Sequence, residues 1–263
     1  MYSPLRGRGL RAPRAAALPM RALRQTLKDM RRNSPWQMVQ AALAVIEDRA
    51  FDWRYGLDTG GITPLEDLAI DSRHVVHGVH YAPTRVRYFR AVLRALPIPR
   101  DSVFVDIGAG KGRALLLAAQ SGRFRKVVGV EFSAELCRAA EQNIRRFQRH
   151  CAGNVTFELV HTDAADYEVQ PDQNVFFMFN PFGPVVMEQV IQRIGQSLEK
   201  VPRRIWVICL GLRSGCTSAL AEGGYKETGR VTYGSAKVSV FVNDASQIES
   251  RTYSQACEGL AVS

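Results

Sequence analysis

The chain has 263 residues, 46% of them hydrophobic, and a formal net charge of +10. This length is enough for one large α/β domain with an extension and a sizeable core. No apolar run approaches the roughly 20 residues that span a bilayer, so neither a transmembrane segment nor a secretory signal is predicted. The five cysteines contain no Cys-x-x-Cys pair, which argues against a disulfide framework or a zinc site and favours the cytoplasm.

Most of the positive charge lies near the N-terminus, where the first 50 residues hold ten Arg and Lys side chains against three acids. Residues 1–18 show no apolar period and are expected to be disordered. From there, apolar residues recur at helical spacing between basic ones, at Met20, Leu23, Leu27 and Met30. Such a basic amphipathic helix could bind an anionic partner, either lipid or nucleic acid, or dock its apolar stripe on the rest of the chain.

A second helix is predicted to begin at Ser34-Pro35, because serine can cap a helix and proline fits its first turn. Its apolar period runs through Trp36, Val39, Leu43 and Ile46. Residues 1–60 are therefore expected to form a basic N-terminal extension that is partly disordered and partly helical.

Residues 61–100 are expected to form a helical segment that leads into the main domain. Three histidines at positions 74, 77 and 80 have no carboxylate or cysteine grouped with them at ligand spacing, so no metal site is predicted. Pro83 can open a helix that stops near Pro97. Its apolar face consists of Val86, Phe89, Val92 and Leu93.

From residue 102 onward, apolar strands alternate with amphipathic helices. The predicted strands are 103–107, 127–131, 155–160, 174–180, 204–210, 225–231 and 236–242, and the predicted helices are 112–121, 134–148 and 185–199. Ser133 can cap the second of these helices. This alternation predicts an α/β fold with a mostly parallel sheet covered on both faces, and the last two strands are expected to form an antiparallel hairpin.

The first of these strands ends in a turn of three alternate glycines, Asp106-Ile107-Gly108-Ala109-Gly110-Lys111-Gly112-Arg113. Gly108 and Gly110 can take left-handed backbone angles and let a ligand lie on the main chain, while Gly112 allows the new helix to pack close to its strand. A phosphate-binding P-loop needs Gly-Lys followed by a hydroxyl residue, and a dinucleotide fingerprint needs its third glycine at position 113. The spacing excludes both, and leaves another kind of nucleotide-binding turn or a tight turn without a ligand.

Two further elements follow at the ends of the next strands. Glu131 lies about 20 residues after the glycine turn, where an acid can accept hydrogen bonds from a ribose diol, and Phe132 can lie on an adenine face. Asp163 and Ala164 follow the third strand. Each acid has an ordinary alternative role, Glu131 near a helix N-terminus and Asp163 in a turn. Together, however, the three elements meet where the strand order of a doubly wound sheet reverses.

On these residues the chain resembles the class I S-adenosylmethionine-dependent methyltransferases, over about residues 80–245. The resemblance implies the Rossmann-like methyltransferase fold: a seven-stranded, mostly parallel, doubly wound sheet with a C-terminal antiparallel hairpin, here with a helical N-terminal extension. The catalytic domain would span residues 101–245, followed by a tail over 246–263. The implied cofactor is S-adenosyl-L-methionine, with Asp106 holding its methionyl amino group and Asp163 and Ala164 reading its adenine. The cofactor-binding residues implied are Asp106, Gly108, Ala109, Gly110, Gly112, Glu131, Phe132, Asp163 and Ala164.

The fourth strand ends in Asn180-Pro181-Phe182, which is similar to the Asn/Asp-Pro-Pro-Tyr/Phe motif of methyltransferases that modify nitrogen. In that motif the Asn oxygen accepts hydrogen bonds from the target N–H, and the aromatic ring packs on the target. The second proline is missing here, and Asn-Pro is also an ordinary end to a strand. Tyr81 belongs to a Tyr-x-Pro-Thr sequence that resembles an element of some protein-lysine methyltransferases, where it borders the cofactor.

The resemblance therefore implies an S-adenosylmethionine-dependent methyltransferase that modifies a nitrogen of a protein lysine, a nucleic acid base or a small amine. Its catalytic residues would be Asn180, Pro181, Phe182 and Tyr81. A different class of function is the alternative: a non-catalytic protein that binds the cofactor, or nucleic acid through its basic N-terminus.

Overall fold

The computed structural model describes residues 35–62, 81–150, 154–179, 182–211, 216–233 and 236–243. The chain divides into two compact units, Met1–Ala42 and Leu43–Ser263. Every contact described below lies within the second unit. The basic helix predicted over residues 20–32 lies outside the described residues. None of the described helices is long and apolar enough to cross a membrane.

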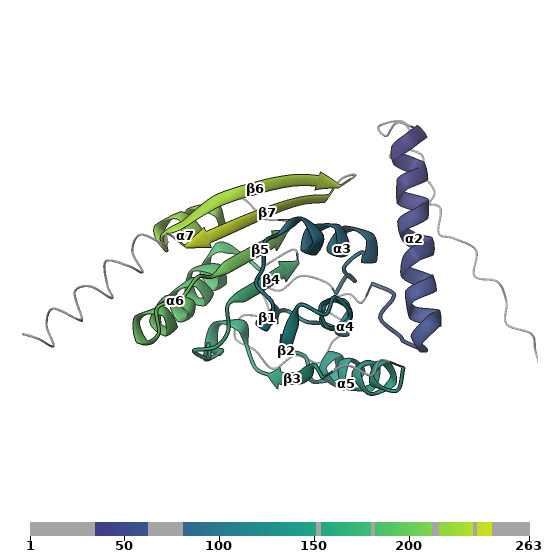
Figure 1. Cartoon of the computed structure of the whole chain (residues 1–263), viewed down its shortest axis with the longest axis horizontal. Coiled ribbons are helices and arrows are strands. Elements are labelled where there is room, and N and C mark those ends of the chain that lie inside the picture. Colours follow the sequence, from purple (N-terminus) through teal and green to yellow (C-terminus); the bar gives the residue numbers. More distant parts are fainter. Residues whose placement is uncertain are drawn as a thin grey trace, which may run out of the picture. The chain divides into compact units, whose positions relative to one another are not determined.

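A seven-stranded sheet with the order β3-β2-β1-β4-β5-β7-β6 organises the second unit (Figure 1). The strands are β1 Ser102–Ile107, β2 Phe124–Glu131, β3 Thr156–His161, β4 Val175–Phe179, β5 Trp206–Leu210, β6 Tyr225–Tyr233 and β7 Ala236–Asn243. Strands β1 to β5 pair in parallel, whereas β7 is antiparallel to both β5 and β6. This arrangement confirms the predicted doubly wound sheet and its C-terminal hairpin.

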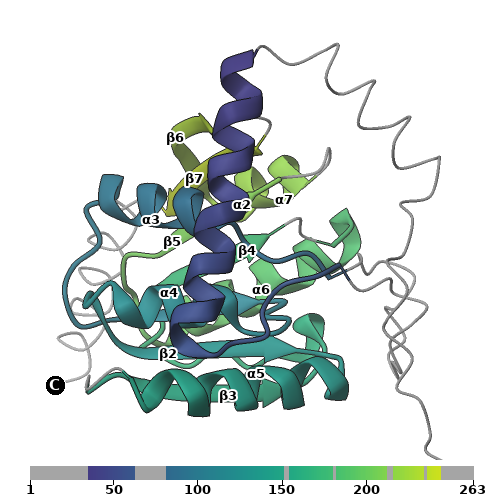
Figure 2. The ribbon, with the colours of Figure 1, turned by 90° about the vertical axis from the view of Figure 1, so that its right-hand side faces the viewer.

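The helices are α2 Pro35–Tyr55, α3 Val86–Ala95, α4 Arg113–Gln120, α5 Ala134–Gln148, α6 Pro184–Lys200 and α7 Cys216–Glu222, with a short 3-10 turn, η3, over Ala164–Asp166. Helix α5 packs beside the edge strand β3, as Figure 2 shows. Helix α7 is absent from the helices predicted from the sequence. Ser133 caps α5 as predicted, its hydroxyl accepting the Leu136 N–H at 3.3 Å.

Each face of the sheet carries its own apolar core. On one face Phe104 of β1 and Phe177 of β4 stack at 6.0 Å between ring centroids, and Phe89 of α3 meets Phe177 edge-on at 5.0 Å. On the other face, Val105 and Phe176 join the buried side of α6. Because both faces are covered, the central strands are continuously apolar rather than alternating.

The apolar period of helix α2 identified the helix but not the face that it buries. The helix continues past Ile46 to Tyr55, and Leu43 and Ile46 are 38% and 59% exposed. The buried positions are Ala44, Asp48, Phe51 and Tyr55. The inward face thus includes a carboxylate, which an apolar period cannot indicate.

Helix α3 begins at Val86, three residues later than the predicted start at Pro83. Its N-terminus is capped from another helix, since Asp48 Oδ1 of α2 accepts the Val86 N–H at 2.9 Å. The predicted apolar face is confirmed, because Val86, Phe89, Val92 and Leu93 are all buried.

Candidate cofactor-binding site

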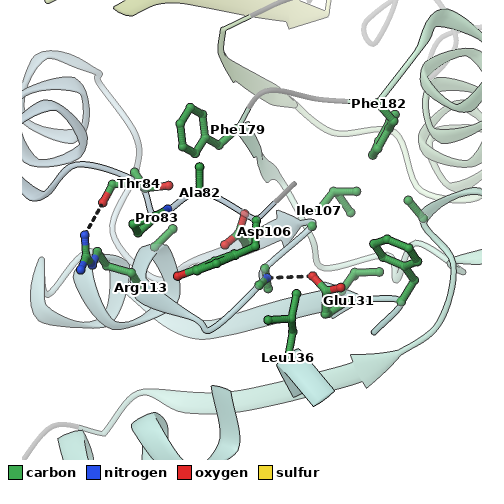
Figure 3. Close-up of a pocket in the computed structure, with 18 of the residues that line it drawn as sticks. Ala82, Pro83, Thr84, Asp106, Ile107, Arg113, Glu131, Leu136, Phe179 and Phe182 are labelled. Carbon is green, nitrogen blue, oxygen red and sulfur yellow. Dashed lines mark hydrogen bonds between the residues drawn. The ribbon is translucent and has the colours of Figure 1, made fainter. Parts of the chain in front are cut away.

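A pocket of about 930 Å³, including its open mouth, lies at the carboxyl ends of β1, β2 and β4 (Figure 3). Strand β1 pairs with β2 on one side and β4 on the other, so the strand order reverses here. Ligands of open α/β sheets bind at this switch point. The loop that precedes α3 and the start of α4 complete the walls.

Gly108 and Gly110 have the predicted left-handed backbone, with φ of 88° and 55°, and Gly112 also has a left-handed φ of 86°. The N–H groups of Gly108 and Ala109 donate to the Val130 carbonyl at 2.8 and 3.0 Å, which fastens the turn to β2. Gly108, Ala109 and Gly110 line the pocket.

Gly112 has a different role from the predicted one. It precedes α4 outside the pocket lining, and a Cβ at this position would stand 3.3 Å from Cβ of Ala140. The space beside this glycine is therefore occupied by α5 rather than by the strand before α4. The prediction failed because the sequence could not show that α5 crosses at this position.

Tyr81 covers the second glycine of the turn. A Cβ built at Gly110 would lie 2.3 Å from Tyr81 Cε2, so only glycine leaves room for the ring. The Tyr81 hydroxyl donates to the Thr59 carbonyl at 2.7 Å. Burial raises the pKa of Tyr81, which keeps it a neutral phenol. The structure thus places Tyr81 at the glycine turn and in the pocket lining, while the contact with the cofactor that the resemblance implies remains a prediction.

Glu131 is 3% exposed and joins the second strand to the glycine turn. Its Oε2 accepts the Gly110 N–H at 2.8 Å and its Oε1 accepts the Ser133 N–H at 2.9 Å. Burial raises the pKa of Glu131, although these backbone donors oppose the rise. The Phe132 backbone also lowers this pKa, so three backbone groups donate to the carboxylate, which keeps part of its acceptor capacity for a hydroxyl of a ligand.

Asp106 lies on the pocket floor and is also 3% exposed. No described residue donates a hydrogen bond to its carboxyl group. Burial raises the pKa of Asp106 well above its usual range, and the nearby Glu131 carboxylate raises it further. A buried carboxyl without a donor, open to a pocket, suits a cationic ligand group such as an ammonium.

The remaining cofactor residues of the sequence analysis differ in their positions. Phe132 and Ala164 line the pocket, together with Thr162. Asp163 does not, because its carboxylate accepts the Ala165 N–H at 2.9 Å and caps the η3 turn. The adenine contact expected of Asp163 therefore remains a prediction.

The acceptor side of the pocket is described only in part. Asn180 and Pro181 lie outside the described residues. Phe182 lines the pocket, as does Phe179 at the end of β4. In Figure 3 these rings flank the opening on the side away from Leu136.

Sequence reasoning missed Arg113, which lines the pocket and is 3% exposed. Its guanidinium bonds to Asp52 and Thr59, both more than 50 residues earlier in the chain. The one available signal was the spacing of Asp48 and Asp52, which lie four residues apart and therefore on the same side of a helix. Among the described residues, no group of His, Cys, Asp and Glu could hold a metal ion.

The model of the family "Histone methylation protein DOT1" matches residues 75–194, somewhat less than half of the chain. This match spans the glycine turn, Glu131 and the end of β4, at the edge of a sheet with the methyltransferase strand order. The chain has the fold of the class I S-adenosylmethionine-dependent methyltransferases. Among curated proteins, this methyltransferase is 35% identical over 68 residues to a protein-lysine N-methyltransferase of Saccharolobus islandicus. The aligned stretch is 26% of this chain and 42% of that protein's length.

The chain is also similar to solved structures, at lower sequence identity. An RNA methyltransferase from Salinibacter ruber in complex with S-adenosyl-L-homocysteine aligns with 62% of this chain and 95% of its own, at a TM-score of 0.48 and 17% identity. The tRNA methyltransferase TrmK of B. subtilis aligns with 60% of this chain and 68% of its own, at a TM-score of 0.48 and 12% identity. The fold of this methyltransferase follows from its own strand order rather than from these likenesses.

Proposed function

We propose that this class I methyltransferase transfers a methyl group from S-adenosyl-L-methionine to the side-chain nitrogen of a protein lysine. The observation that carries the methyl-donor part is the Asp106 carboxyl, which is buried on the pocket floor beside Glu131 and has no hydrogen-bond donor among the described residues. The lysine part is supported by the match to the DOT1 family model and the similarity to a protein-lysine N-methyltransferase.

The residues of the pocket fit the methyl donor in three places. Asp106 would pair with the methionyl ammonium group, and Glu131 would accept hydrogen bonds from the ribose hydroxyls while still holding Gly110. Phe132 and Ala164 would border the adenine. When bound, S-adenosylmethionine supplies a methyl group already activated on a sulfonium, so the protein mainly aligns the acceptor and excludes water.

A lysine acceptor must lose its proton before it can attack. The rim at Tyr81, Phe179 and Phe182 is aromatic, and such surroundings disfavour the charged ammonium by desolvation. We assign Asn180 as acceptor of the target N–H and Pro181 as the residue that fixes its backbone, on the resemblance of the motif. Phe182 would pack on the lysine methylenes.

Two wider features fit the proposal. The described cysteines, Cys137, Cys209 and Cys216, are buried and none of the three forms a disulfide, which supports a cytoplasmic location. The basic extension would contact an anionic partner, and that contact would weaken steeply as salt increases.

The experiment is transfer of a labelled methyl group from S-adenosylmethionine into fractionated cell protein, RNA and small molecules, followed by hydrolysis of the protein to amino acids. We expect the label in methylated lysine, and none with Glu131→Ala. Label confined to RNA would contradict the lysine assignment. Cofactor binding without any transfer would support the non-catalytic alternative.

A further inference from the structure

The buried guanidinium of Arg113 joins three separate segments of the chain. Its Nε donates to Thr59 Oγ1 at 2.6 Å and its Nη2 to Asp52 Oδ2 at 2.8 Å. Its Nη1 lies 3.4 Å from the Thr84 carbonyl, a contact visible in Figure 3, and 3.5 Å from Asp48 Oδ2. One side chain at the start of α4 thus contacts α2, the loop after it and the loop before α3.

Two of these contacts reach the methyl-donor pocket. Thr84 is itself a lining residue, and its carbonyl is held directly. Thr59 holds Tyr81, because its carbonyl accepts the tyrosine hydroxyl while its own hydroxyl accepts from Arg113. Arg113 therefore fixes both ends of the Tyr81–Thr84 segment, one directly and one through Thr59.

The position of this charge cluster also favours a role at the pocket. Burying a guanidinium with two carboxylates contributes little net stability, because desolvation offsets the attraction between the charges. Arg113, at the centre of the cluster, directly follows Gly112 of the glycine turn, and it also lines the pocket. Its four acceptors lie in different directions, which a planar guanidinium can satisfy and a lysine ammonium cannot.

We infer that Arg113 is a positioning residue, which holds Tyr81 and Thr84 against the glycine turn in the arrangement that the methyl donor requires. This inference rests on the proposed function, since it concerns binding of the same donor. Arg113 acts through its neighbours and need not touch the reacting atoms.

Arg113→Lys tests the inference, with Arg203→Lys as the matched control. Arg203 also bonds to several segments, donating to the carbonyls of Gln173 and Val201 and to Ser197 Oγ, but none of these residues lines the pocket. We expect Arg113→Lys to weaken S-adenosylhomocysteine binding about tenfold and to raise KM for S-adenosylmethionine more than it lowers kcat. Arg203→Lys should lower the Tm while leaving the affinity unchanged.

A double-mutant cycle separates positioning from general stability. Tyr81→Phe removes the bond to the Thr59 carbonyl, so its effect on binding should be much smaller in the Arg113→Lys background than in the wild type. If Arg113→Lys does not fold, Thr59→Val tests the inference in its place. This variant removes the hydroxyl that accepts a hydrogen bond from Arg113 and leaves all charges in place. The inference would be overturned if the folded Arg113→Lys variant, or Thr59→Val, bound S-adenosylhomocysteine with wild-type affinity. It would also be overturned if the effects of Tyr81→Phe and Arg113→Lys on the binding free energy were strictly additive. Absence of S-adenosylhomocysteine binding in the wild type would instead refute the proposed function.

Discussion

The ring of Tyr81 lies so close to Gly110 that a methyl group at position 110 would stand 2.3 Å from Tyr81 Cε2. The second glycine of the turn is therefore required by a side chain of the protein as well as by its backbone angle. The sequence alone explained this glycine by the approach of a ligand. The structure adds that Tyr81 already occupies one side of the turn.

Replacing Gly110 with alanine should displace Tyr81 and disrupt the pocket. The matched control is Gly122→Ala, because Gly122 has a similar φ of 66° but open space around its Cβ. The left-handed backbone should cost each variant about 1 kcal/mol of unfolding free energy, and Gly110→Ala should lose more. Urea unfolding and titration with S-adenosylhomocysteine measure both effects. Equal stability and equal affinity in the two variants would show that the Tyr81 contact has no consequence.

Asp106→Asn should stabilise the ligand-free protein and weaken binding of the methyl donor. In the folded state the pKa of Asp106 is raised above its unfolded value, so the folded state binds more protons between the two values. Stability is therefore lost as pH rises through this interval, and the full cost is present above the folded-state pKa. An uncharged amide removes a cost of about 1–3 kcal/mol. Urea unfolding at several pH values should show the smallest gain at low pH, and a variant less stable than the wild type at neutral pH would contradict the assignment.

Binding of the methyl donor should release protons at pH values around and below the raised pKa of Asp106. Asp106 must ionise to pair with the methionyl ammonium, so affinity should fall as pH drops through the raised pKa of the free protein. Calorimetry in buffers of different ionisation enthalpy counts the protons released. Asp106→Asn should bind weakly with little pH dependence. An affinity in the wild type that does not change with pH would argue against this ion pair.

The aromatic rim should affect the acceptor rather than the methyl donor. Phe182→Leu is expected to raise KM for a lysine peptide several-fold, with S-adenosylhomocysteine affinity nearly unchanged, since the hydrophobic area lost corresponds to about 1 kcal/mol. Asn180→Ala should lower kcat and also retain the affinity. Wild-type KM in Phe182→Leu and wild-type kcat in Asn180→Ala would show that these residues do not belong to the acceptor site.

The parts of the site that follow strand ends could be predicted from the sequence. Asp106, Glu131 and the glycine turn are each fixed by a local pattern, an apolar run followed by an acid or by glycine. Parallel pairing then brings Glu131 within 2.8 Å of the Gly110 N–H without further information.

The buried polar contacts could not be predicted in the same way. Arg113 finds its partners 54 and 61 residues away in Thr59 and Asp52, and its neighbours in sequence give no sign of them. Asp163 shows the opposite case, in which a local bond to the Ala165 N–H competes with a ligand for the carboxylate. Packing of helices and loops decides such contacts, and a periodic pattern does not encode it.

Calorimetric titration of the wild type and Glu131→Ala with S-adenosylhomocysteine and with NAD tests the central claim most directly. The account predicts that S-adenosylhomocysteine binds the wild type at one site, binds Glu131→Ala at least tenfold more weakly, and that NAD binds neither. Binding of NAD by the wild type, without binding of S-adenosylhomocysteine, would contradict it.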